Sequence, residues 1–268
     1  MTDKYAVIGN PIAHSKSPQI HMMFAEQTGQ GISYETILAP LDGFTATVER
    51  LRSDGYKGCS VTVPFKFEAF ELATELSVRA RSAQAVNTLT FKDDSINGDN
   101  TDGAGLVRDI EQNLGISLKG KRVLLVGAGG AAFGVAQPLF KAGSRLSVTN
   151  RTIEKAQRMV ESFDEEHVIS IFEYSSLKNE SFDVVINATS TGLSNEMPPL
   201  PSTIFAPGAL AYDMMYGRKT PFMKFAREQG AQVADGLGML VEQAAEAFNI
   251  WRGVRPDTAP VISKFRSS

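Results

Sequence analysis

The sequence lacks most features that mark secreted, membrane-bound or nucleic-acid-binding proteins. Cys59 is the single cysteine, so no intrachain disulfide can form, as is typical of a reducing compartment. The longest apolar runs are far shorter than a membrane span, and the N-terminal residues MTDKYAVIGN do not resemble a signal peptide. A net charge of −3 gives no general attraction to nucleic acids or anionic membranes. We therefore expect a cytoplasmic protein with no nucleic-acid or membrane partner.

The sequence also has no internal repeat and no low-complexity segment. Hydrophobic residues make up 43% and charged residues 21% of the 268 residues, which is typical of a globular protein and argues against disorder. This length allows one large domain or two of ordinary size.

One stretch, residues 121–152, has the order of elements found in a dinucleotide-binding unit. Gly127, Gly129 and Ala132 occupy the three small-residue positions of a G-x-G-x-x-G/A pattern. Glycine there allows a tight turn and a close approach of the backbone to a pyrophosphate, which the following helix N-terminus would bind. The alternative is a glycine-rich turn without a ligand. The predicted strand, helix and second strand are Lys121–Val126, Ala131–Lys141 and Arg145–Thr149.

The end of the second strand indicates which dinucleotide would bind. An NAD site places an acidic residue near position 150, whereas this chain has Asn150, Arg151 and Thr152, followed by Lys155. A carboxylate would repel a 2′-phosphate, while an arginine can bind it through charge-assisted hydrogen bonds. Cations are disfavoured at a helix N-terminus, so two of them there indicate an anionic ligand. The alternative is that both are only solvated residues at the start of a helix. We therefore predict NADP as the cofactor.

Two hydroxyl groups precede the first predicted helix, which runs from Pro18 to about Thr28. Ser17 and Pro18 are typical of an N-cap followed by a proline at the first helical position, so capping alone explains Ser17. Ser15 has no such structural explanation. Beside a helix N-terminus, Ser15 and Ser17 together would form a receptor for a carboxylate.

Two charged residues are predicted at junctions between strands and helices in the first part of the chain. Lys66 follows the strand Gly58–Val63 and has Thr62 nearby. Asp102 immediately precedes a predicted helix. The alternatives are a solvated lysine and an aspartate that only caps the helix. Asn87 lies in another predicted strand and must find hydrogen-bond partners if it is buried.

The second half continues the alternation of strands and helices. The strand Asp183–Asn187 leads to small and hydroxyl residues of the kind that line a cofactor crevice, and the strand Leu210–Met214 leads to Tyr216. A long helix, Met239–Trp251, carries Gln243 at the border of its apolar stripe. From its spacing, Gln243 is either a partly exposed helix residue or a ligand contact.

These patterns predict an α/β protein built from three segments. Residues 1–102 would form a first α/β domain, to which the family resemblance given below assigns substrate binding, and residues 103–236 a Rossmann domain that binds NADP. Residues 237–268 would form C-terminal helices that pack back on the first domain.

The chain resembles the shikimate dehydrogenases over nearly its whole length and in collinear order. In the first half the matching motifs are Asn10–Pro18 (NPIAHSKSP), Val61–Lys66 (VTVPFK), Ala85–Thr88 (AVNT) and Asp99–Gly103 (DNTDG). In the second half they are Gly127–Ala131 (GAGGA), Asn150–Thr152 (NRT), Asn187–Ser190 (NATS), Tyr212–Tyr216 (YDMMY) and Asp235–Ala245 (DGLGMLVEQAA). Agreement over so many separate motifs makes the resemblance highly specific.

The resemblance implies a reversible, NADPH-dependent reduction of 3-dehydroshikimate to shikimate in aromatic amino-acid biosynthesis. We expect a monomer or homodimer and no metal. The implied substrate-binding residues are Ser15, Ser17, Thr62, Asn87, Tyr216 and Gln243, with Lys66 and Asp102 as the catalytic pair. The implied cofactor-binding residues are Gly127, Ala128, Gly129, Gly130, Ala131, Asn150, Arg151, Thr152, Lys155, Thr189, Ser190, Met214 and Gly236.

Three positions depart from the commonest pattern of that family. Ser60 stands where asparagine is usual, Gln84 where glycine is usual, and Phe133 where arginine is frequent. They leave open a diverged member that also acts on quinate, with NADP or NAD, or a catalytically silent NADP(H)-binding sensor. Lys66 and Asp102 together argue against the sensor, because an ammonium can protonate a carbonyl that gains charge and a carboxylate can orient a hydroxyl.

Overall fold

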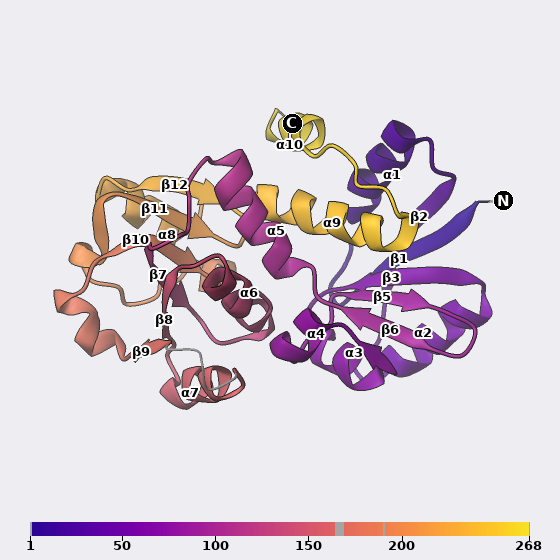
Figure 1. Cartoon of the computed structure of the whole chain (residues 1–268), viewed down its shortest axis with the longest axis horizontal. Coiled ribbons are helices and arrows are strands. Elements are labelled where there is room, and N and C mark those ends of the chain that lie inside the picture. The colour runs from indigo at the N-terminus through magenta and orange to yellow at the C-terminus, as the bar shows by residue number, and fades with distance from the viewer. Residues whose placement is uncertain (1, 164–168, 190, 268) are drawn as a thin grey trace. The chain divides into compact units, whose positions relative to one another are not determined.

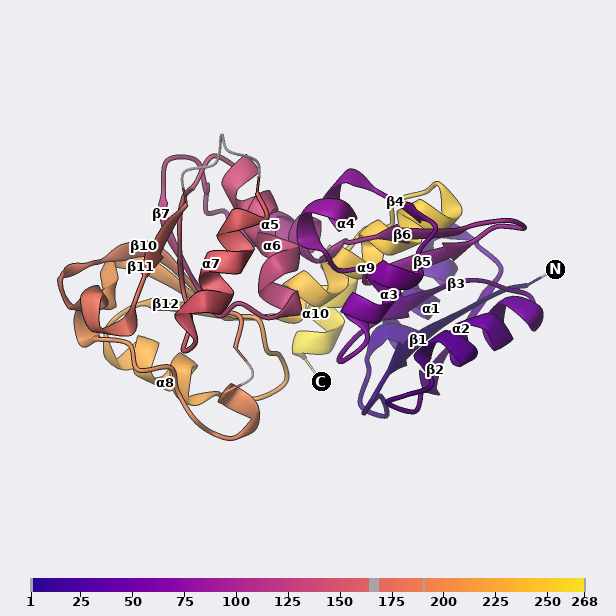
Figure 2. The same cartoon turned by 90° about the horizontal axis from the view of Figure 1, so that it is seen from below.

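The computed structural model describes residues 2–163, 169–189 and 191–267. The chain forms two compact units, one made of the residues up to 105 together with those from 240 onward, and the other of residues 106–239 (Figures 1 and 2). Each unit is a sheet covered by helices, which confirms the predicted α/β class and the return of the C-terminal helices to the first unit. The predicted limits after residues 102 and 236 lie close to these divisions, and their use as domain boundaries stays a prediction.

The first unit contains a six-stranded sheet in the order β2-β1-β3-β5-β6-β4. β1 is parallel to β2 and β3, whereas β5 is antiparallel to both β3 and β6. The ends of β1, β3 and β6 and the start of β5 therefore lie at one edge of the sheet. The strands are β1 (Asp3–Gly9), β2 (Ile32–Leu38), β3 (Tyr56–Val61), β4 (Glu75–Leu76), β5 (Thr88–Phe91) and β6 (Ile96–Asp99).

Helices cover both faces of this sheet because alternate strand residues point to opposite sides. Ile8 and Val61 belong to an apolar core beneath α2, α3 and α4. On the other face, Tyr5 of β1 stacks on Trp251 of α9, with ring centroids 4.7 Å apart. The helices are α1 (Ser17–Thr28), α2 (Phe44–Ser53), α3 (Lys66–Leu72), α4 (Val78–Ala83), α9 (Leu237–Arg252) and α10 (Ala259–Arg266).

The sequence does not predict β4, β6 or α4, all of which are short. It predicts one helix over about Glu68–Leu76, whereas α3 begins at Lys66 and ends at Leu72. The prediction for residues 73–76 is wrong because Glu75 and Leu76 pair with β6 as a strand. Since α3 begins two residues early, Lys66 is a helical residue and not a loop residue.

The second unit contains a six-stranded parallel sheet in the order β12-β11-β10-β7-β8-β9. This is the strand order of a Rossmann fold, and it confirms the predicted dinucleotide-binding unit. The order reverses between β7 and β10, and ligands of such sheets bind at the carboxyl ends of the strands beside that reversal. The strands are β7 (Arg122–Val126), β8 (Arg145–Thr149), β9 (Ser170–Phe172), β10 (Phe182–Asn187), β11 (Phe205–Asp213) and β12 (Gln232–Asp235).

Two apolar cores bury the faces of the second sheet. Helices α5, α6 and α7 pack on one face and α8 on the other. These helices are α5 (Asp102–Arg108), which continues as a π-helical turn over Asp109–Asn113, α6 (Gly130–Lys141), α7 (Ile153–Glu161) and α8 (Pro221–Glu228).

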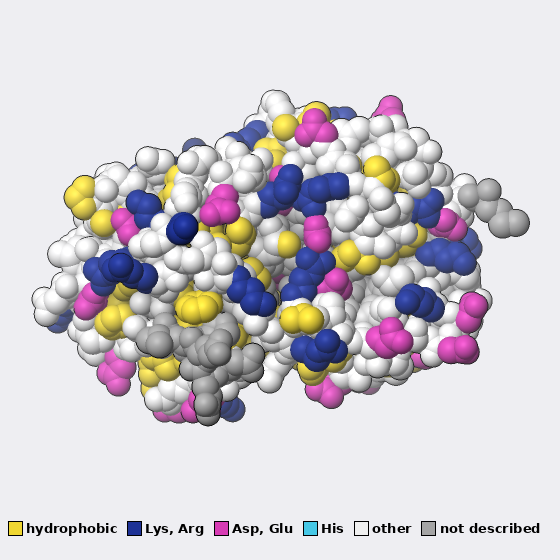
Figure 3. Space-filling model, in the orientation of Figure 1, with side chains coloured by type: hydrophobic (Ala, Val, Ile, Leu, Met, Phe, Trp, Pro, Cys, Tyr) yellow, Lys and Arg dark blue, Asp and Glu magenta, His cyan; other side chains and the backbone are white. Residues whose placement is uncertain are grey.

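The surface carries charges of both signs. Lysine and arginine side chains occur together with aspartate and glutamate across the face shown in Figure 3, in agreement with the net charge of −3. In the part of the chain that the structure describes, no helix is long and apolar enough to cross a membrane.

Gln84 ends α4 in the left-handed conformation, with φ 46° and ψ 30°. A Cβ atom disfavours this conformation, whereas glycine adopts it freely. We predict that Gln84→Gly raises the free energy of unfolding by about 1 kcal/mol, while Gln84→Ala, which keeps a Cβ atom, gives no such gain. Urea-induced unfolding of both variants measures the difference. Equal stability of the two would contradict strain at this position.

His21 of α1 is a polar side chain that packs among aromatic rings beneath α9. It is fully buried and stacks on Tyr34, with ring centroids 4.2 Å apart. Neither ring nitrogen has a hydrogen-bond partner among the described residues. Because burial disfavours the imidazolium, it lowers the pKa of His21 to about 3. The ring is therefore neutral in the folded protein, whereas in the unfolded chain it takes up a proton near pH 6.5.

We predict that the protein loses stability as the pH falls below about 6.5, because the unfolded chain then binds a proton at His21 that the folded protein does not. The loss from this group should reach about 2 kcal/mol at pH 5. His21→Phe keeps an aromatic ring and removes the titrating site, so it should lose less stability between pH 7.5 and pH 5. Urea unfolding at both pH values measures this, and an identical loss in both proteins would refute the assignment.

Candidate active site and dinucleotide crevice

Lys66 and Asp102 form an ion pair in the first unit. Lys66 is the first residue of α3, shortly after β3, and Asp102 is the first residue of α5, shortly after β6. Lys66 Nζ donates a hydrogen bond to Asp102 Oδ2. The two side chains are only 14% and 7% exposed, so neither is a solvated surface group. A largely buried ammonium beside a carboxylate can donate a proton to a bound carbonyl oxygen.

Asn87 connects this ion pair to the surrounding backbone. Its Nδ2 donates hydrogen bonds to Asp102 Oδ1 at 2.8 Å and to Thr101 Oγ1 at 2.9 Å. Its Oδ1 accepts from Thr101 N at 2.9 Å and from the Thr88 hydroxyl at 2.8 Å. Each Asp102 oxygen thus has a donor, from Lys66 or from Asn87, and keeps a lone pair for a substrate hydroxyl.

Gln243 of α9 lies beside Asn87. Its Oε1 is 3.4 Å from Asn87 Nδ2 and 3.3 Å from Thr101 Oγ1, and its Nε2 donates to Leu240 O at 2.8 Å. The structure therefore brings together Lys66, Asp102, Asn87 and Gln243, which the sequence separates by up to 177 positions (243 − 66).

Thr62 directly follows β3 and is half-buried at the same sheet edge. Its backbone N–H donates to Ile8 O at 2.9 Å, so Thr62 extends the pairing of β1 and β3. Gly9 makes this close approach possible, because a Cβ atom at that position would lie 2.5 Å from Thr62 Cγ2. The geometry fixes where Thr62 lies, and its contact with substrate stays a prediction.

Ser15 and Ser17 lie at the N-terminus of α1, but their local roles differ from those predicted. The N-cap is Lys16, whose side chain makes no capping bond, and Ser17 is already helical. The backbone N–H of Ser17 donates to Ser15 Oγ at 3.3 Å. The prediction of Ser17 as the cap is wrong, because Ser15 accepts from a helix N-terminal N–H instead. The Ser17 side chain, which is buried, is therefore not committed to capping.

Tyr216 belongs to the second unit, in the loop after β11. It is half-buried, and burial raises the pKa of its hydroxyl, so it is a neutral hydrogen-bonding group. Its role as a substrate contact stays a prediction.

The glycine-rich turn between β7 and α6 leaves room for a phosphate. Gly127 has φ +119°, and a Cβ atom there would lie 3.2 Å from Ala188 O. Gly129 is the exposed N-cap of α6, and a Cβ atom there would meet nothing within 4 Å. The turn of Ala128 and Gly129 is thus uncrowded in front of the first N–H groups of α6, those of Gly130 and Ala131, and a helix N-terminus of this kind is a favourable anion site. These residues fit the pyrophosphate of a dinucleotide.

The segment between β8 and α7 presents positive charge at the same end of the sheet. Asn150 Nδ2 donates to Thr152 O at 2.8 Å, which shapes the turn before α7. Arg151 and Lys155 are exposed, and neither side chain has a hydrogen bond or ion pair within the described ranges. Two such cationic side chains, and no carboxylate at position 150, fit a 2′-phosphate.

The loops after β10 and β11 form the other side of this edge. Met214 N donates to Asn187 O at 3.0 Å. Thr189 Oγ1 donates to Asn187 Oδ1 at 2.7 Å. Gly236 approaches this edge so closely that a Cβ atom would lie 2.2 Å from Met214 O. Ser190, the remaining predicted cofactor contact here, lies outside the described residues.

Asp213 is a buried residue at this edge of the sheet. It lies in the YDMMY motif, but the sequence alone predicts no role for it. Its carboxylate accepts hydrogen bonds from Thr220 Oγ1 at 2.5 Å, Met215 N at 3.0 Å and Asn187 Nδ2 at 3.4 Å. Burial raises the pKa of Asp213. The carboxylate joins the loops after β10 and β11. The signal for it in the sequence is an acidic residue at the end of an apolar strand.

The chain matches the shikimate dehydrogenase substrate binding domain over residues 7–89, shikimate / quinate 5-dehydrogenase over residues 108–194, and the shikimate 5′-dehydrogenase C-terminal domain over residues 236–263. It is 62% identical to the shikimate dehydrogenase (NADP(+)) of Methylobacillus flagellatus, over 99% of this chain and 100% of that relative. The chain belongs to the shikimate dehydrogenase family. The resemblance drawn from its motifs is confirmed.

Two solved structures extend this assignment to the fold. An Ael1 enzyme from Pseudomonas putida has a TM-score of 0.93 and 50% identity, over 98% of each chain. A shikimate 5-dehydrogenase from Thermus thermophilus, in complex with NADP(H) and shikimate, has a TM-score of 0.89 and 32% identity, over 99% of each chain. The described residues of this family member contain no group of three His, Cys, Asp or Glu side chains placed to hold a metal ion.

We predict that Asn87→Ala lowers the free energy of unfolding by roughly 2–4 kcal/mol, because it removes the partner of several buried polar groups at once. Asn97→Ala, in β6 of the same sheet, is the control, since the Asn97 carboxamide accepts a single side-chain bond from Ser95. Urea unfolding compares the two. If Asn87→Ala is no less stable than Asn97→Ala, Asn87 is not the connecting residue described above.

Proposed function

We propose that this protein catalyses the reversible reduction of 3-dehydroshikimate to shikimate with NADPH. The observation that carries the proposal is the ion pair of Lys66 and Asp102, held by Asn87 and bordered by Gln243. The Methylobacillus relative is named an NADP(+)-dependent shikimate dehydrogenase, and the Thermus structure holds NADP(H) and shikimate, which supports the choice of substrate and cofactor.

The second unit would hold the cofactor, which supplies the hydride when bound. The backbone of residues 127–131 would bind the pyrophosphate at the N-terminus of α6. Arg151 and Lys155 would bind the 2′-phosphate, with Asn150 and Thr152 shaping the turn that presents them. Thr189, Met214 and Gly236 would line the crevice at the switch point of the sheet, and Ser190 is proposed with them.

The first unit would bind the substrate and transfer the proton. Ser15 and Ser17, beside the N-terminus of α1, bind the carboxylate. The Lys66 ammonium donates a hydrogen bond to the reacting carbonyl oxygen and protonates it as negative charge develops there. Asp102 orients that ammonium and accepts a hydrogen bond from a substrate hydroxyl. Thr62, Asn87 and Gln243 bind the other substrate oxygens, and Tyr216 of the second unit is proposed as a further substrate contact.

The same pair serves both directions of the reaction. In reduction Lys66 Nζ gives a proton to the carbonyl oxygen, and in oxidation the same nitrogen accepts the proton of the substrate hydroxyl.

A spectrophotometric assay of the purified protein tests the proposal. Shikimate and quinate are each offered with NADP and with NAD, and formation of the reduced nucleotide is followed. We expect the highest kcat/KM with shikimate and NADP. Preference for quinate or for NAD would place the protein among diverged members of the family, and no turnover with any pair would overturn the enzymatic function.

We predict that Lys66→Ala lowers kcat about 10²–10⁴-fold and raises KM for shikimate much less, because its ammonium acts mainly on the transition state. Lys57→Ala is the control, since Lys57 is an exposed lysine of β3. A melting curve shows that each variant is folded. Near-normal kcat in folded Lys66→Ala would leave Lys66 a binding residue at most.

We predict that Arg151→Ala raises KM for NADP about 10–100-fold and leaves KM for NAD and shikimate nearly unchanged, because one charge-assisted contact contributes roughly 1.5–3 kcal/mol. Arg158→Ala, an exposed arginine further along α7, serves as the control. Steady-state kinetics with both nucleotides measures the change. A variant that still prefers NADP over NAD as strongly as the parent contradicts the assignment of Arg151.

We further propose that the protein is cytoplasmic and acts as a monomer or homodimer on a small-molecule substrate. Its single cysteine, Cys59, is buried and free, which agrees with a reducing compartment. Size-exclusion chromatography with light scattering distinguishes the two oligomeric states.

A further inference from the structure

A network of charged side chains joins α9 to β6 in the first unit, beside the proposed active site. Arg79 of α4 is at its centre. Its guanidinium donates to both oxygens of Asp99, from Nε at 2.6 Å and from Nη2 at 3.0 Å, and its Nη1 donates to Glu246 Oε1 at 2.9 Å. A bidentate arginine–carboxylate pair with a third bond is a geometrically defined link, and Arg79 is only 29% exposed.

The network continues on the side of α9. Arg255 donates from Nη1 to Glu246 Oε2 at 2.5 Å and from Nη2 to Glu242 Oε2 at 2.8 Å. The Thr258 hydroxyl donates to Glu242 Oε1 at 2.5 Å. The Glu242 side chain is only 1% exposed, so its position is fixed. Glu242 directly precedes Gln243, and Glu246 lies one helical turn further on.

At its other end the network reaches Asp102 through the backbone. The Asn100 N–H donates to Asp99 Oδ1 at 2.7 Å, and the Asp102 N–H donates to Asn100 Oδ1 at 3.1 Å. The Asn87 N–H donates to Asp99 O at 3.0 Å. The carboxylate that Arg79 holds is therefore linked to Asp102 through Asn100, and the backbone carbonyl of the same Asp99 is bonded to Asn87.

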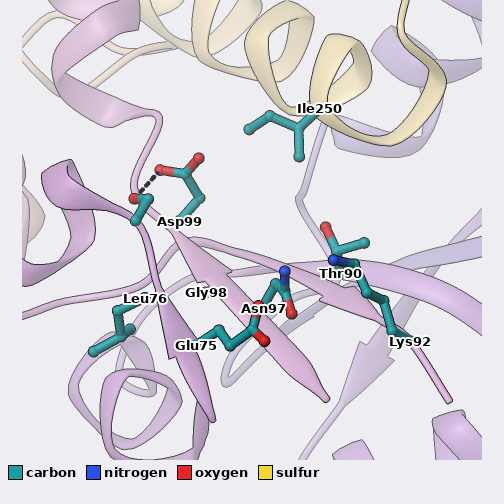
Figure 4. Close-up of a pocket in the computed structure, with 9 residues that line it drawn as sticks. Glu75, Leu76, Thr90, Lys92, Asn97, Gly98, Asp99 and Ile250 are labelled. Carbon is teal, nitrogen blue, oxygen red and sulfur yellow. Dashed lines mark hydrogen bonds between the residues drawn. The ribbon is translucent and has the colours of Figure 1, made fainter. Parts of the chain in front are cut away.

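An open pocket lies between Ile250 of α9 and the strands. It has a volume of about 360 Å³ and is lined by Thr90 of β5, Asn97 and Asp99 of β6, and Ile250 (Figure 4). Ile250 faces this pocket from above, and the Ser77–Asp99 hydrogen bond of 2.6 Å lies at its margin. Trp251 holds the next residue of α9 to β5 through its bond to Leu89 O. Beside the pocket, the bonds of Arg79 to Asp99 and Glu246 form a direct polar link that contributes to the distance between α9 and β6.

That distance matters for Gln243. Its carboxamide oxygen is 3.3–3.4 Å from Thr101 and Asn87, at the long end of hydrogen bonding. A small shift of α9 would break these contacts and move Gln243 away from Asp102. Misplacement of a substrate-binding group by about 1 Å can cost about 100-fold in rate.

We propose that Arg79 is a positioning residue of the active site, which through Asp99 and Glu246 holds Gln243 and Asp102 at the spacing that the substrate requires. This inference rests on the proposed function. A purely structural role of Arg79 would affect stability alone. A positioning role predicts impaired use of substrate at temperatures where the Arg79 variant is fully folded.

Steady-state kinetics of Arg79→Ala and Arg79→Lys test it, with Arg252→Ala as the matched control. Arg252 lies on α9 and, like Arg79, links that helix to another part of the first unit, through its bonds to Asp3 and Gln30. We expect Arg79→Ala to lower kcat/KM for shikimate about 10–100-fold and to leave KM for NADP unchanged. Arg79→Lys, which keeps the charge and loses the bidentate pair, should be intermediate. Arg252→Ala should lose thermal stability and keep normal kinetics.

Glu246→Gln provides a second variant if Arg79→Ala does not fold, since it keeps the shape of the side chain and removes one charge. Like Arg79→Ala, it should lower kcat/KM for shikimate and leave KM for NADP unchanged. Normal shikimate kinetics in folded Arg79→Ala or, where that variant does not fold, in folded Glu246→Gln overturns the positioning role while the proposed function stands. A parent protein without shikimate turnover overturns the proposed function itself and this inference with it.

Discussion

A carboxylate removed from water must be paired and hydrogen-bonded, and the first unit is arranged around this requirement at Asp102. Lys66 supplies the charge, Asn87 supplies the second donor, and Thr101 and Thr88 in turn satisfy Asn87. The two donors reach one end of the sheet from different elements, Lys66 from the start of α3 and Asn87 from the residue before β5. The arrangement of β3, β5 and β6 that brings these residues together is therefore what allows a largely buried charged pair to exist.

The second unit meets a different constraint, since its ligand site must be mostly backbone. Gly127 and Gly236 remove Cβ atoms where strand ends and loops approach within contact distance, and Asp213 ties the loops after β10 and β11. In the proposed function the two units have different tasks. The first would orient side chains around the reacting carbon, and the second would present N–H groups and cations to the phosphates.

Much of the fold and of the candidate site can be predicted from the sequence. The features that cannot be predicted share physical reasons. The Rossmann unit was predictable because apolar strands and glycines recur at diagnostic spacing, as at Gly127 and Gly129. β4, β6 and α4 were not, because they are short and tertiary pairing creates them. The N-cap of α1 was misassigned by one residue, a shift that local preferences do not resolve. The bonds of Arg79 span 20 and 167 positions, so only the folded chain shows them.

Trp251 has a consequence for how this protein can be observed. It is the only tryptophan of the chain, it stacks on Tyr5, and its indole N–H donates to Leu89 O at 3.1 Å. Gly58 leaves the space, since a Cβ atom there would lie 2.8 Å from the indole nitrogen. Intrinsic tryptophan fluorescence therefore arises entirely from α9, the helix that carries Gln243. The protein contains a built-in optical reporter on its substrate-binding half and none on its nucleotide-binding half.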